Sequence, residues 1–250
     1  KVLGKPLFIH EQNAVAGLTN RLLSNFADQV FEAYPDTFES SVRAIYTGNP
    51  LRAKVLRVKK SFKAKNDSPL RLLVLGGSQG ALSINSVIPD FLSGHGLAAD
   101  IQLLHQTGHK SFAKAVEAYK NRGIPLDENF RVLPFIEEVS EAYAWADIVI
   151  SRSGASTVSE LAAIGLPSIL IPYPHHSDNQ QLLNAKWLVN EGAAILIRQA
   201  DFNVHNLEKI VQPFITDRSR LQDMAVNARK IGIRDAAQQI VQLCVGTAHE

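Results

Sequence analysis

The sequence is poor in cysteine and in net charge, and it contains no long apolar run. Its one cysteine, Cys244, cannot form a disulfide within the chain, which favours a reducing compartment. A formal net charge of +2 is too small to indicate a nucleic-acid partner. No apolar run approaches the roughly 18–20 residues that span a bilayer. With 46% hydrophobic and 20% charged residues, the 250-residue chain predicts one large globular domain or two smaller ones.

Several cofactor and metal motifs are also missing. The glycine-rich segment 76–81 is neither G-x-G-x-x-G nor a Walker A loop, so it indicates neither a dinucleotide nor ATP. No Asp-x-Asp pair occurs, and we expect no metal and no cofactor. His175, His176 and Asp178 do not have the spacing of a standard zinc motif. They predict a loop in which Asp178 or Asn179 caps the following helix.

Short apolar strands alternate with helical patterns along most of the chain. The predicted strands are residues 7–9, 29–33, 43–46, 72–75, 101–105, 131–135, 148–150, 168–171 and 194–197. The predicted helices are 17–27, 81–91, 110–122, 140–145, 158–164 and 180–190, with a helical tail from about residue 203 that breaks near Gly232. This alternation predicts an α/β fold with doubly wound parallel sheets and right-handed crossovers.

A basic segment separates two parts of the chain. Seven lysines and arginines lie between Arg52 and Lys65, and no acid lies between Glu39 and Asp67. Such a run is usually a solvated linker, although anionic lipid head groups would also attract it, by about 1 kcal/mol per residue. We place a domain boundary here, which divides the chain into residues 1–50, a linker at 51–69, residues 70–232 and a final helix at 233–250.

The most informative stretch, residues 148–184, contains two successive strand–loop–helix units. These units place polar residues at the carboxyl ends of parallel strands, where ligands bind in open α/β sheets. Small residues around Gly154 would let a diphosphate approach a helix N-terminus. Glu160, one turn further, could accept hydrogen bonds from ribose hydroxyls. Equally, Thr157 and Glu160 fit a capping box, in which Glu160 only caps its own helix.

Two other strand ends carry polar or glycine-rich segments. Residues 72–81 form a strand, a glycine turn and the start of a helix, in which Ser78 could donate to a phosphate oxygen. A turn without a ligand is the alternative. Residues 10–13, HEQN, offer hydrogen bonds to a sugar, although a surface loop with Asn13 as a turn residue fits equally well.

Taken together, five segments closely resemble the MurG family of bacterial glycosyltransferases. They are HEQNAVAGLTN, TGNPLR, LGGSQGALSIN, AYAWADIVISRSGASTVSELAAIGLP and DNQQLLNA. That family transfers N-acetylglucosamine (GlcNAc) from UDP-GlcNAc to lipid I, which gives lipid II for peptidoglycan. The resemblance covers essentially the whole chain. It implies a GT-B fold of two Rossmann-like domains, with residues 1–50 the last part of the first (acceptor) domain and residues 70–232 the UDP-GlcNAc-binding domain.

The resemblance also implies residue roles. Arg52 would lie against the uracil, and Ile136 would offer its backbone to the uracil edge. Glu160 would bind the ribose, so the resemblance favours a ligand role for Glu160 over a role only as a helix cap. The diphosphate would lie at Ser78 and residues 155–157, and the transferred sugar at Asn13 and at Gln180 or Gln181. The expected substrate-binding residues are Asn13, Arg52, Ser78, Ile136, Ala155, Ser156, Thr157, Val158, Ser159, Glu160, Gln180 and Gln181.

The implied chemistry is inverting glycosyl transfer, in which helix N-termini rather than a metal stabilise the leaving diphosphate. The glycine-rich loop that carries the family's proposed general base has no counterpart here, and the chain starts at Lys1 rather than Met. We therefore expect an upstream segment to be missing. The catalytic base is unassigned, with His10 and Glu11 as weak candidates. These 250 residues alone are expected to bind the donor without transferring the sugar.

The implied partners are UDP-GlcNAc, lipid I and the cytoplasmic face of the bacterial inner membrane, where the protein would be peripheral. Its role would be in peptidoglycan synthesis, and hence in cell shape and division. One alternative is a UDP-sugar epimerase of the same fold, which needs acid/base carboxylates that face the sugar; Glu11 is the candidate for this role. The other alternative is a non-catalytic UDP-sugar-binding module.

Overall fold

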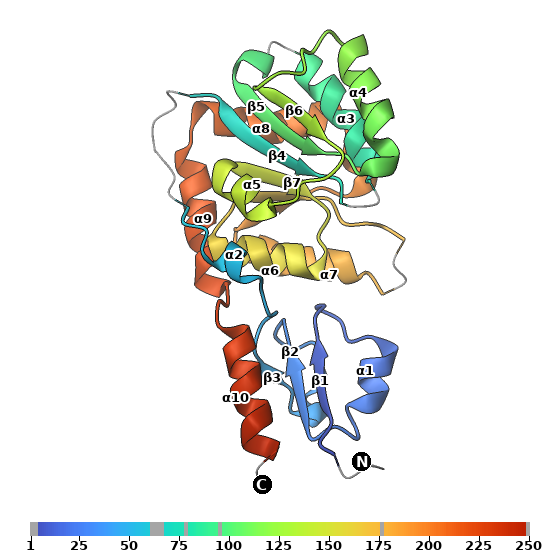
Figure 1. Ribbon diagram of the computed structural model, residues 1–250, viewed down its shortest axis with the longest axis vertical. Coiled ribbons are helices and arrows are strands. Elements are labelled where there is room, and N and C mark those ends of the chain that lie inside the picture. Colours follow the sequence, from blue (N-terminus) through green and yellow to red (C-terminus); the bar gives the residue numbers. More distant parts are fainter. Residues whose placement is uncertain (1–4, 61–67, 78–79, 95–96, 176–177, 249–250) are drawn as a thin grey trace.

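The computed structural model describes residues 5–60, 68–77, 80–94, 97–175 and 178–248, which form two parallel sheets (Figure 1). The smaller sheet has the order β1-β2-β3, from β1 (Phe8–Glu11), β2 (Gln29–Glu32) and β3 (Ile45–Tyr46). The larger sheet has the order β6-β5-β4-β7-β8-β9. Its strands are β4 (Leu70–Leu75), β5 (Ile101–Gln106), β6 (Phe130–Leu133), β7 (Ile148–Ser151), β8 (Ser168–Leu170) and β9 (Ala194–Leu196).

The strand order of the larger sheet determines where a ligand can bind. From β4 the chain adds β5 and β6 on one side, then returns to add β7, β8 and β9 on the other. All neighbouring strands are parallel, so their carboxyl ends share one edge. The connections diverge between β4 and β7, and at such a switch point they leave a crevice.

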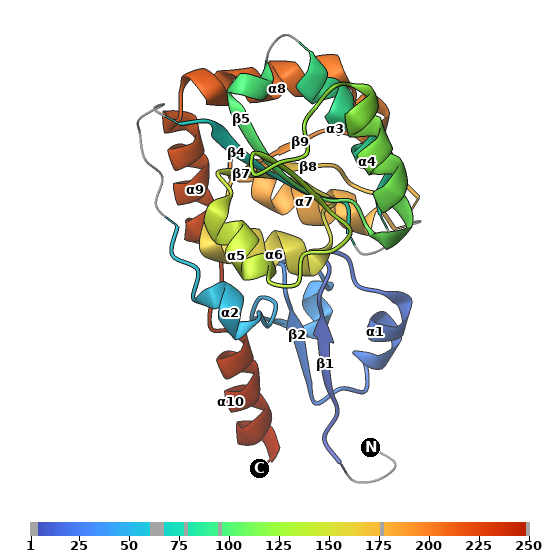
Figure 2. The ribbon, with the colours of Figure 1, turned by 45° about the horizontal axis from the view of Figure 1, so that its top comes forward.

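Helices cover both faces of the larger sheet (Figure 2). The helices of both parts of the described chain are α1 (Leu18–Leu23), α2 (Ala53–Leu56), α3 (Leu82–Ser93), α4 (Phe112–Asn121), α5 (Val139–Trp145), α6 (Ala155–Ile164), α7 (Gln180–Asn190), α8 (Val204–Thr216), α9 (Ser219–Ile231) and α10 (Ala236–Ala248). Of these, α1 and α10 lie beside the smaller sheet (Figure 1). Successive side chains of a strand point to opposite faces. Leu72 and Val74 therefore pack with α3 and α8, whereas Leu73 packs with α5, α6 and α7. Burial on both faces explains why these strands are continuously apolar.

The smaller sheet meets the larger one at the start of α6. The Tyr34 hydroxyl, which is buried, donates to the carbonyl of Ala155 at 3.2 Å. Asn49 Nδ2 donates to Ser159 Oγ at 2.9 Å. After α9 the chain returns past Gly48, where an added Cβ would lie 2.8 Å from Ile233, and α10 then lies beside the smaller sheet (Figure 1). Contacts from both ends of the chain therefore surround this junction.

All nine predicted strands and the predicted α/β alternation are present, with shifted boundaries. The sixth strand ends at Leu133, two residues earlier than predicted, because residues 134–138 form the approach to α5. Helix α6 begins at Ala155 rather than at 158. The predicted linker contains a short helix, α2, that the sequence analysis missed. Residues 61–67 of that linker lie outside the described ranges.

Candidate functional site

A cavity of about 510 Å³ lies at the carboxyl edge of the larger sheet. It brings together five predicted residues: Arg52, Ile136, Ser156, Thr157 and Glu160. Because they come from the residue before α2, the β6–α5 connection and α6, only the fold makes them neighbours.

Glu160 holds a polar cluster at one side of this cavity. Its buried carboxylate accepts hydrogen bonds from Arg52 Nε (3.0 Å) and Nη2 (2.7 Å) through Oε1. Its Oε2 accepts from the Tyr143 hydroxyl at 2.9 Å. Burial, and next the charge of Glu160, raise the pKa of Tyr143, so its hydroxyl stays protonated and donates. No pattern in the sequence indicates Tyr143, because its spacing from Glu160 matches no motif.

The structure contradicts the capping-box alternative for Glu160. Helix α6 begins at Ala155 after Gly154, so Thr157 already lies in the first turn and is not the N-cap. Both carboxylate oxygens are directed to Arg52 and Tyr143 instead. Glu160 therefore faces the cavity and does not satisfy its own helix end.

A run of backbone N–H groups and a glycine turn border the cavity. The first intrahelical bond of α6 runs from Val158 N to Gly154 O, and the N–H groups of residues 155–157 find no acceptor among the described residues. Across from them, Gly77 has a φ of 73° and open space around it. Such unpaired N–H groups, together with the helix dipole, form an anion-binding surface. Ser78, the predicted diphosphate contact, lies outside the described residues.

A buried polar network lies behind the glycine turn. Asn85 Nδ2 donates to the carbonyl of Thr107 at 2.8 Å, so its Oδ1 accepts from His105 Nε2 at 3.0 Å. The other imidazole nitrogen, Nδ1, then accepts from the Tyr119 hydroxyl at 2.7 Å. Burial lowers the pKa of His105 to about 3, so the imidazole is neutral. An added Cβ at Gly76 would lie 3.0 Å from Asn85 Oδ1, so this network supports the turn directly.

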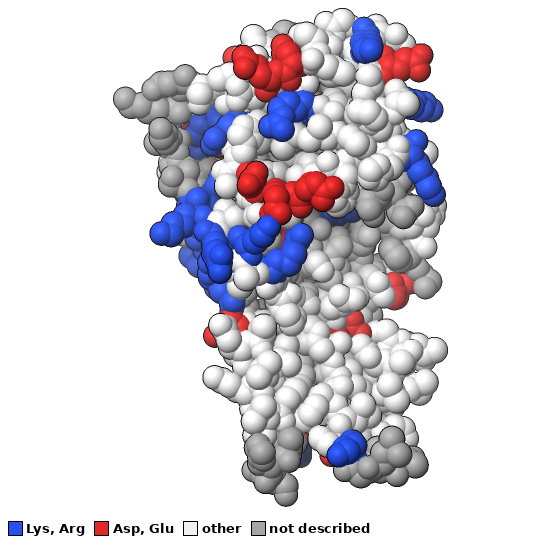
Figure 3. Space-filling view, in the orientation of Figure 1, with Lys and Arg blue, Asp and Glu red and all other residues white. Residues whose placement is uncertain are grey.

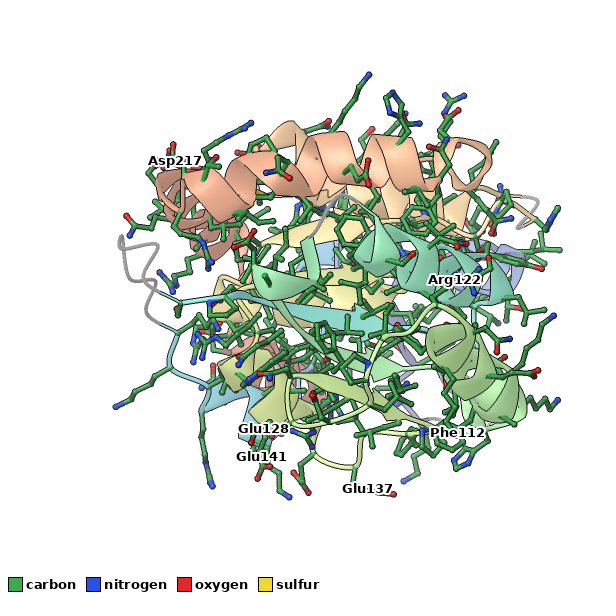
Figure 4. The ribbon with its side chains drawn as sticks, turned by 90° about the horizontal axis from the view of Figure 1, so that it is seen from above. Phe112, Arg122, Glu128, Glu137, Glu141 and Asp217 are labelled. Carbon is green, nitrogen blue, oxygen red and sulfur yellow. The ribbon has the colours of Figure 1, made fainter. Side chains whose placement is uncertain are left out.

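The opposite wall of the cavity is mostly apolar. Leu75, Phe135, Ile136 and Val139 line it, and the Phe135 ring stacks on His109 with centroids 6.1 Å apart. Glu137 also lines the cavity, and it projects outward from this part of the molecule (Figure 4). Such a wall suits a flat, uncharged group better than a phosphate.

A second cavity, of about 430 Å³, adjoins the first and shares Pro50 and Ser156 with it. His10, Glu11, Asn13 and Gln180 also line it. The two cavities together run from the apolar wall, past the N-terminus of α6, to the end of β1.

The two weak candidates for the base differ in their surroundings. Glu11 is buried and accepts four hydrogen bonds: two from Asn13, one from the N–H of Gly17 and one from Asn20. Its carboxylate therefore organises the loop after β1. His10 Nε2 donates to the carbonyl of Gly48 at 3.0 Å, which leaves Nδ1 as its basic nitrogen.

Asn184, on α7, ties the loop after β1 to the larger sheet. Its Oδ1 accepts from the N–H of Ala14 at 2.8 Å. Its Nδ2 donates to Asn13 Oδ1 and to the carbonyl of Ser153, both at 3.2 Å. Asn184 is fully buried, and no sequence pattern indicates its role.

The comparisons with known proteins identify the family. Residues 71–240 match the glycosyltransferase family 28 C-terminal domain. A relative from Shewanella sp. (strain MR-4) is 41% identical over 250 residues, which are 100% of this chain and 68% of the relative. That relative is named UDP-N-acetylglucosamine--N-acetylmuramyl-(pentapeptide) pyrophosphoryl-undecaprenol N-acetylglucosamine transferase. The chain belongs to the MurG family. The crystal structure of Acinetobacter baumannii MurG matches with a TM-score of 0.83 and 34% identity, over 98% of this chain and 68% of that one.

The MurG-family match confirms the predicted GT-B fold. A similarly named relative from Pseudomonas syringae pv. tomato is 43% identical over 251 residues, again 68% of its length. A putative UDP-N-acetylglucosamine 2-epimerase from Listeria monocytogenes matches with a TM-score of 0.62 but only 14% identity, which shows the shared fold alone.

Four predicted MurG-family site residues within the described ranges line neither cavity: Ala155, Val158, Ser159 and Gln181. Val158 is fully buried in the apolar core, and Ser159 Oγ accepts from Asn49. Ala155 is also buried and contributes its carbonyl to Tyr34. Successive helical residues point about 100° apart, so residues 155, 158 and 159 face the protein while 156, 157 and 160 face the cavity. The Val158 and Ser159 side chains therefore face away from both cavities, and the prediction that these two residues bind the substrate stays a prediction.

The structure separates the two glutamines of the MurG-family DNQQ segment. Gln180 lines the second cavity, and its Nε2 donates to Asp178 Oδ2 at 2.6 Å. Gln181 Oε1 instead accepts from the N–H of Tyr173 at 2.9 Å. Asn179 occupies the N-cap position of α7 without a side-chain bond, and Asp178 accepts from the N–H of Gln180. His176 and Ser177 lie outside the described residues.

Neither a metal cluster nor a membrane-spanning helix occurs in the described ranges. No group of three His, Cys, Asp or Glu side chains there could hold a metal ion. None of the helices described combines the length and hydrophobicity needed to cross a bilayer.

Proposed function

We propose that this chain binds UDP-GlcNAc and takes part in transferring GlcNAc to a lipid-linked acceptor, with inversion at the anomeric carbon. One observation carries the proposal: Arg52, Ile136, Glu160 and the N-terminus of α6 converge in one cavity of a MurG-family chain. The names of the relatives supply the donor sugar and the acceptor.

The donor would lie along both cavities. The uracil would pack against the apolar wall of the first cavity, with Arg52 and the Ile136 backbone at its edge. Glu160 would accept hydrogen bonds from the ribose hydroxyls. The diphosphate would lie at Gly77 and the free N–H groups of residues 155–157. Because Ser156 lines both cavities, the sugar would then extend towards Gln180 and Asn13.

The proposed reaction moves charge onto the diphosphate. An acceptor hydroxyl forms a bond to the anomeric carbon, the bond from that carbon to the diphosphate oxygen breaks, and UDP leaves. N–H groups fixed by α6 can stabilise the new charge without reorganising. The acceptor proton must go to a base, which stays unassigned. Between the two weak candidates, the geometry favours His10, since Glu11 is already bound to four donors.

The acceptor suggests where the protein works. The relatives' acceptor is linked to undecaprenol, so we propose a peripheral position at the cytoplasmic face of the bacterial inner membrane and a role in peptidoglycan synthesis, cell shape and division. Lysines and arginines gather beside α2 and α9 (Figure 3). Exposed members of this surface are Lys54, Arg57, Lys59, Arg229 and Lys230. Anionic head groups would attract them.

The test uses radiolabelled UDP-GlcNAc with and without a lipid I analogue, together with calorimetric titration of the donor. Donor binding and acceptor-dependent release of UDP support the proposal. Conversion of the sugar nucleotide without acceptor would support an epimerase instead. Donor binding without either reaction would restrict the chain to the donor-binding part of the proposal, and absence of binding would overturn it.

A further inference from the structure

Gln106 lies where the glycine turn meets the apolar wall of the first cavity. It is the last residue of β5 and is only 7% exposed. Its backbone carbonyl accepts from the N–H of Gly76 at 2.8 Å. Its side-chain Oε1 accepts from the N–H of Ile136 at 3.0 Å. Gln106 therefore links the segment that would hold the diphosphate to the segment that would hold the uracil.

The bond to Ile136 determines which way the Gln106 amide faces. A backbone N–H can only donate, so the atom opposite it must be the amide oxygen. The amide nitrogen then faces elsewhere, and no hydrogen bond joins it to any residue that the structure describes. Within the described ranges, the Gln106 amide nitrogen is also not one of the fully buried polar atoms that lack a hydrogen-bond partner. Since Gln106 lines the cavity, its two N–H donors are available there.

Ile136, whose N–H donates to the Gln106 amide oxygen, also has a carbonyl that accepts no hydrogen bond within the described ranges. The surrounding side chains, Leu75, Phe135 and Val139, are apolar and suit the faces of a flat ring. The wall thus offers an N–H donor and a carbonyl acceptor within an otherwise apolar surface.

We propose that Gln106 selects the nucleobase of the donor and discriminates uracil from cytosine. This inference rests on the proposed function, since it concerns the same nucleotide. Uracil presents a carbonyl next to the N3–H group, which matches the Gln106 amide and the Ile136 carbonyl. Cytosine presents an amino group next to an unprotonated N3, so donor would face donor and acceptor would face acceptor. A site whose buried polar groups are left unpaired rejects the wrong ligand strongly.

The test compares the affinities of UDP and CDP, by calorimetry, for the whole chain and its variants. In Gln106→Glu one carboxylate oxygen can still accept from Ile136, but the donor becomes an acceptor. We expect the ratio of UDP to CDP affinity to fall about tenfold or more. Gln106→Met keeps the length and removes the donor, so the ratio should fall while UDP binding weakens. Gln102→Glu is the matched control, because Gln102 lies on β5 and pairs with Asn129.

Each result decides between the inference and the proposed function. A wild-type chain that binds neither UDP nor UDP-GlcNAc would overturn the proposed function and, with it, the role of Gln106. A wild-type chain that prefers UDP, with folded Gln106→Glu and Gln106→Met variants that keep the wild-type ratio, would overturn only the role of Gln106. The second variant decides the matter if the first does not fold.

Discussion

Arg52 and Glu160 lie 108 residues apart in the sequence and form an ion pair with 2.7 Å between Nη2 and Oε1. The pair is asymmetric, because the Arg52 side chain is 60% exposed and that of Glu160 is 6% exposed. The guanidinium supplies hydrogen bonds to the carboxylate that we propose for the ribose. Ribose hydroxyls that bind Glu160 would therefore replace hydrogen bonds that Arg52 donates.

We predict that Glu160→Gln weakens UDP binding. Loss of hydrogen bonds to a charged carboxylate costs about 1.5–3 kcal/mol, which calorimetric titration detects easily. Glu138→Gln is the matched control, because Glu138 forms an exposed ion pair with Lys54. Equal UDP affinity in both variants would leave Glu160 with a structural role only.

We predict that Tyr143→Phe lowers both the free energy of unfolding and the affinity for UDP. Removal of the hydroxyl leaves Oε2 of the buried Glu160 without its donor, which costs about 1–3 kcal/mol of stability. The less constrained carboxylate should then bind UDP more weakly. Urea unfolding and calorimetry measure the two effects, and Tyr46→Phe, at an exposed tyrosine, should change neither. Wild-type stability in Tyr143→Phe would contradict the prediction.

We predict that Gly77→Val prevents diphosphate binding. Its side chain would occupy open space beside the cavity, where the backbone would meet the phosphates. Gly123→Val is a close control, since Gly123 also has a positive φ, 69° against 73°, and open space around it. Both variants carry similar backbone strain, so their unfolding temperatures should fall together. Only Gly77→Val should lose UDP binding; a folded Gly77→Val that binds UDP normally would show a purely structural turn.

We predict that the buried His105 makes the protein less stable in mild acid. In the unfolded chain its imidazole binds a proton below its ordinary pKa of 6.5, whereas burial lowers the folded pKa to about 3. Stability is therefore complete above pH 6.5 and falls towards pH 3, by up to about 1.4 kcal/mol per pH unit. His105→Gln should be less stable than wild type at neutral pH, and this difference should shrink in acid.

Urea unfolding from about pH 7.5 to about pH 5 measures that difference. His205→Gln, at an exposed histidine, should follow the wild-type curve throughout. A constant difference between His105→Gln and wild type would show that His105 does not cause the loss.

Local chemistry determined much of this protein in advance. Apolar strands, helix patterns and the glycine turn after β4 depend on a few consecutive residues, so the alternation predicted from the sequence appears in the structure. The segments that resemble the MurG family are likewise continuous stretches, and the comparisons confirm that family. Arg52 and Glu160 lie in such stretches, the family resemblance implied the role of Ile136, and the fold brings all three residues to one cavity.

Only the tertiary structure decided what each side chain faces. The start of α6 at Ala155, which packs against Tyr34, sets the rotation that buries Val158 and Ser159 and turns Glu160 towards Arg52 and Tyr143. The sequence pattern around Glu160 fits both a helix cap and a ligand contact, so it cannot predict how α6 is rotated about its axis. The partners Gln106, Tyr143 and Asn184 belong to no local signal, because their contacts join segments from separate elements, and only packing creates those distances.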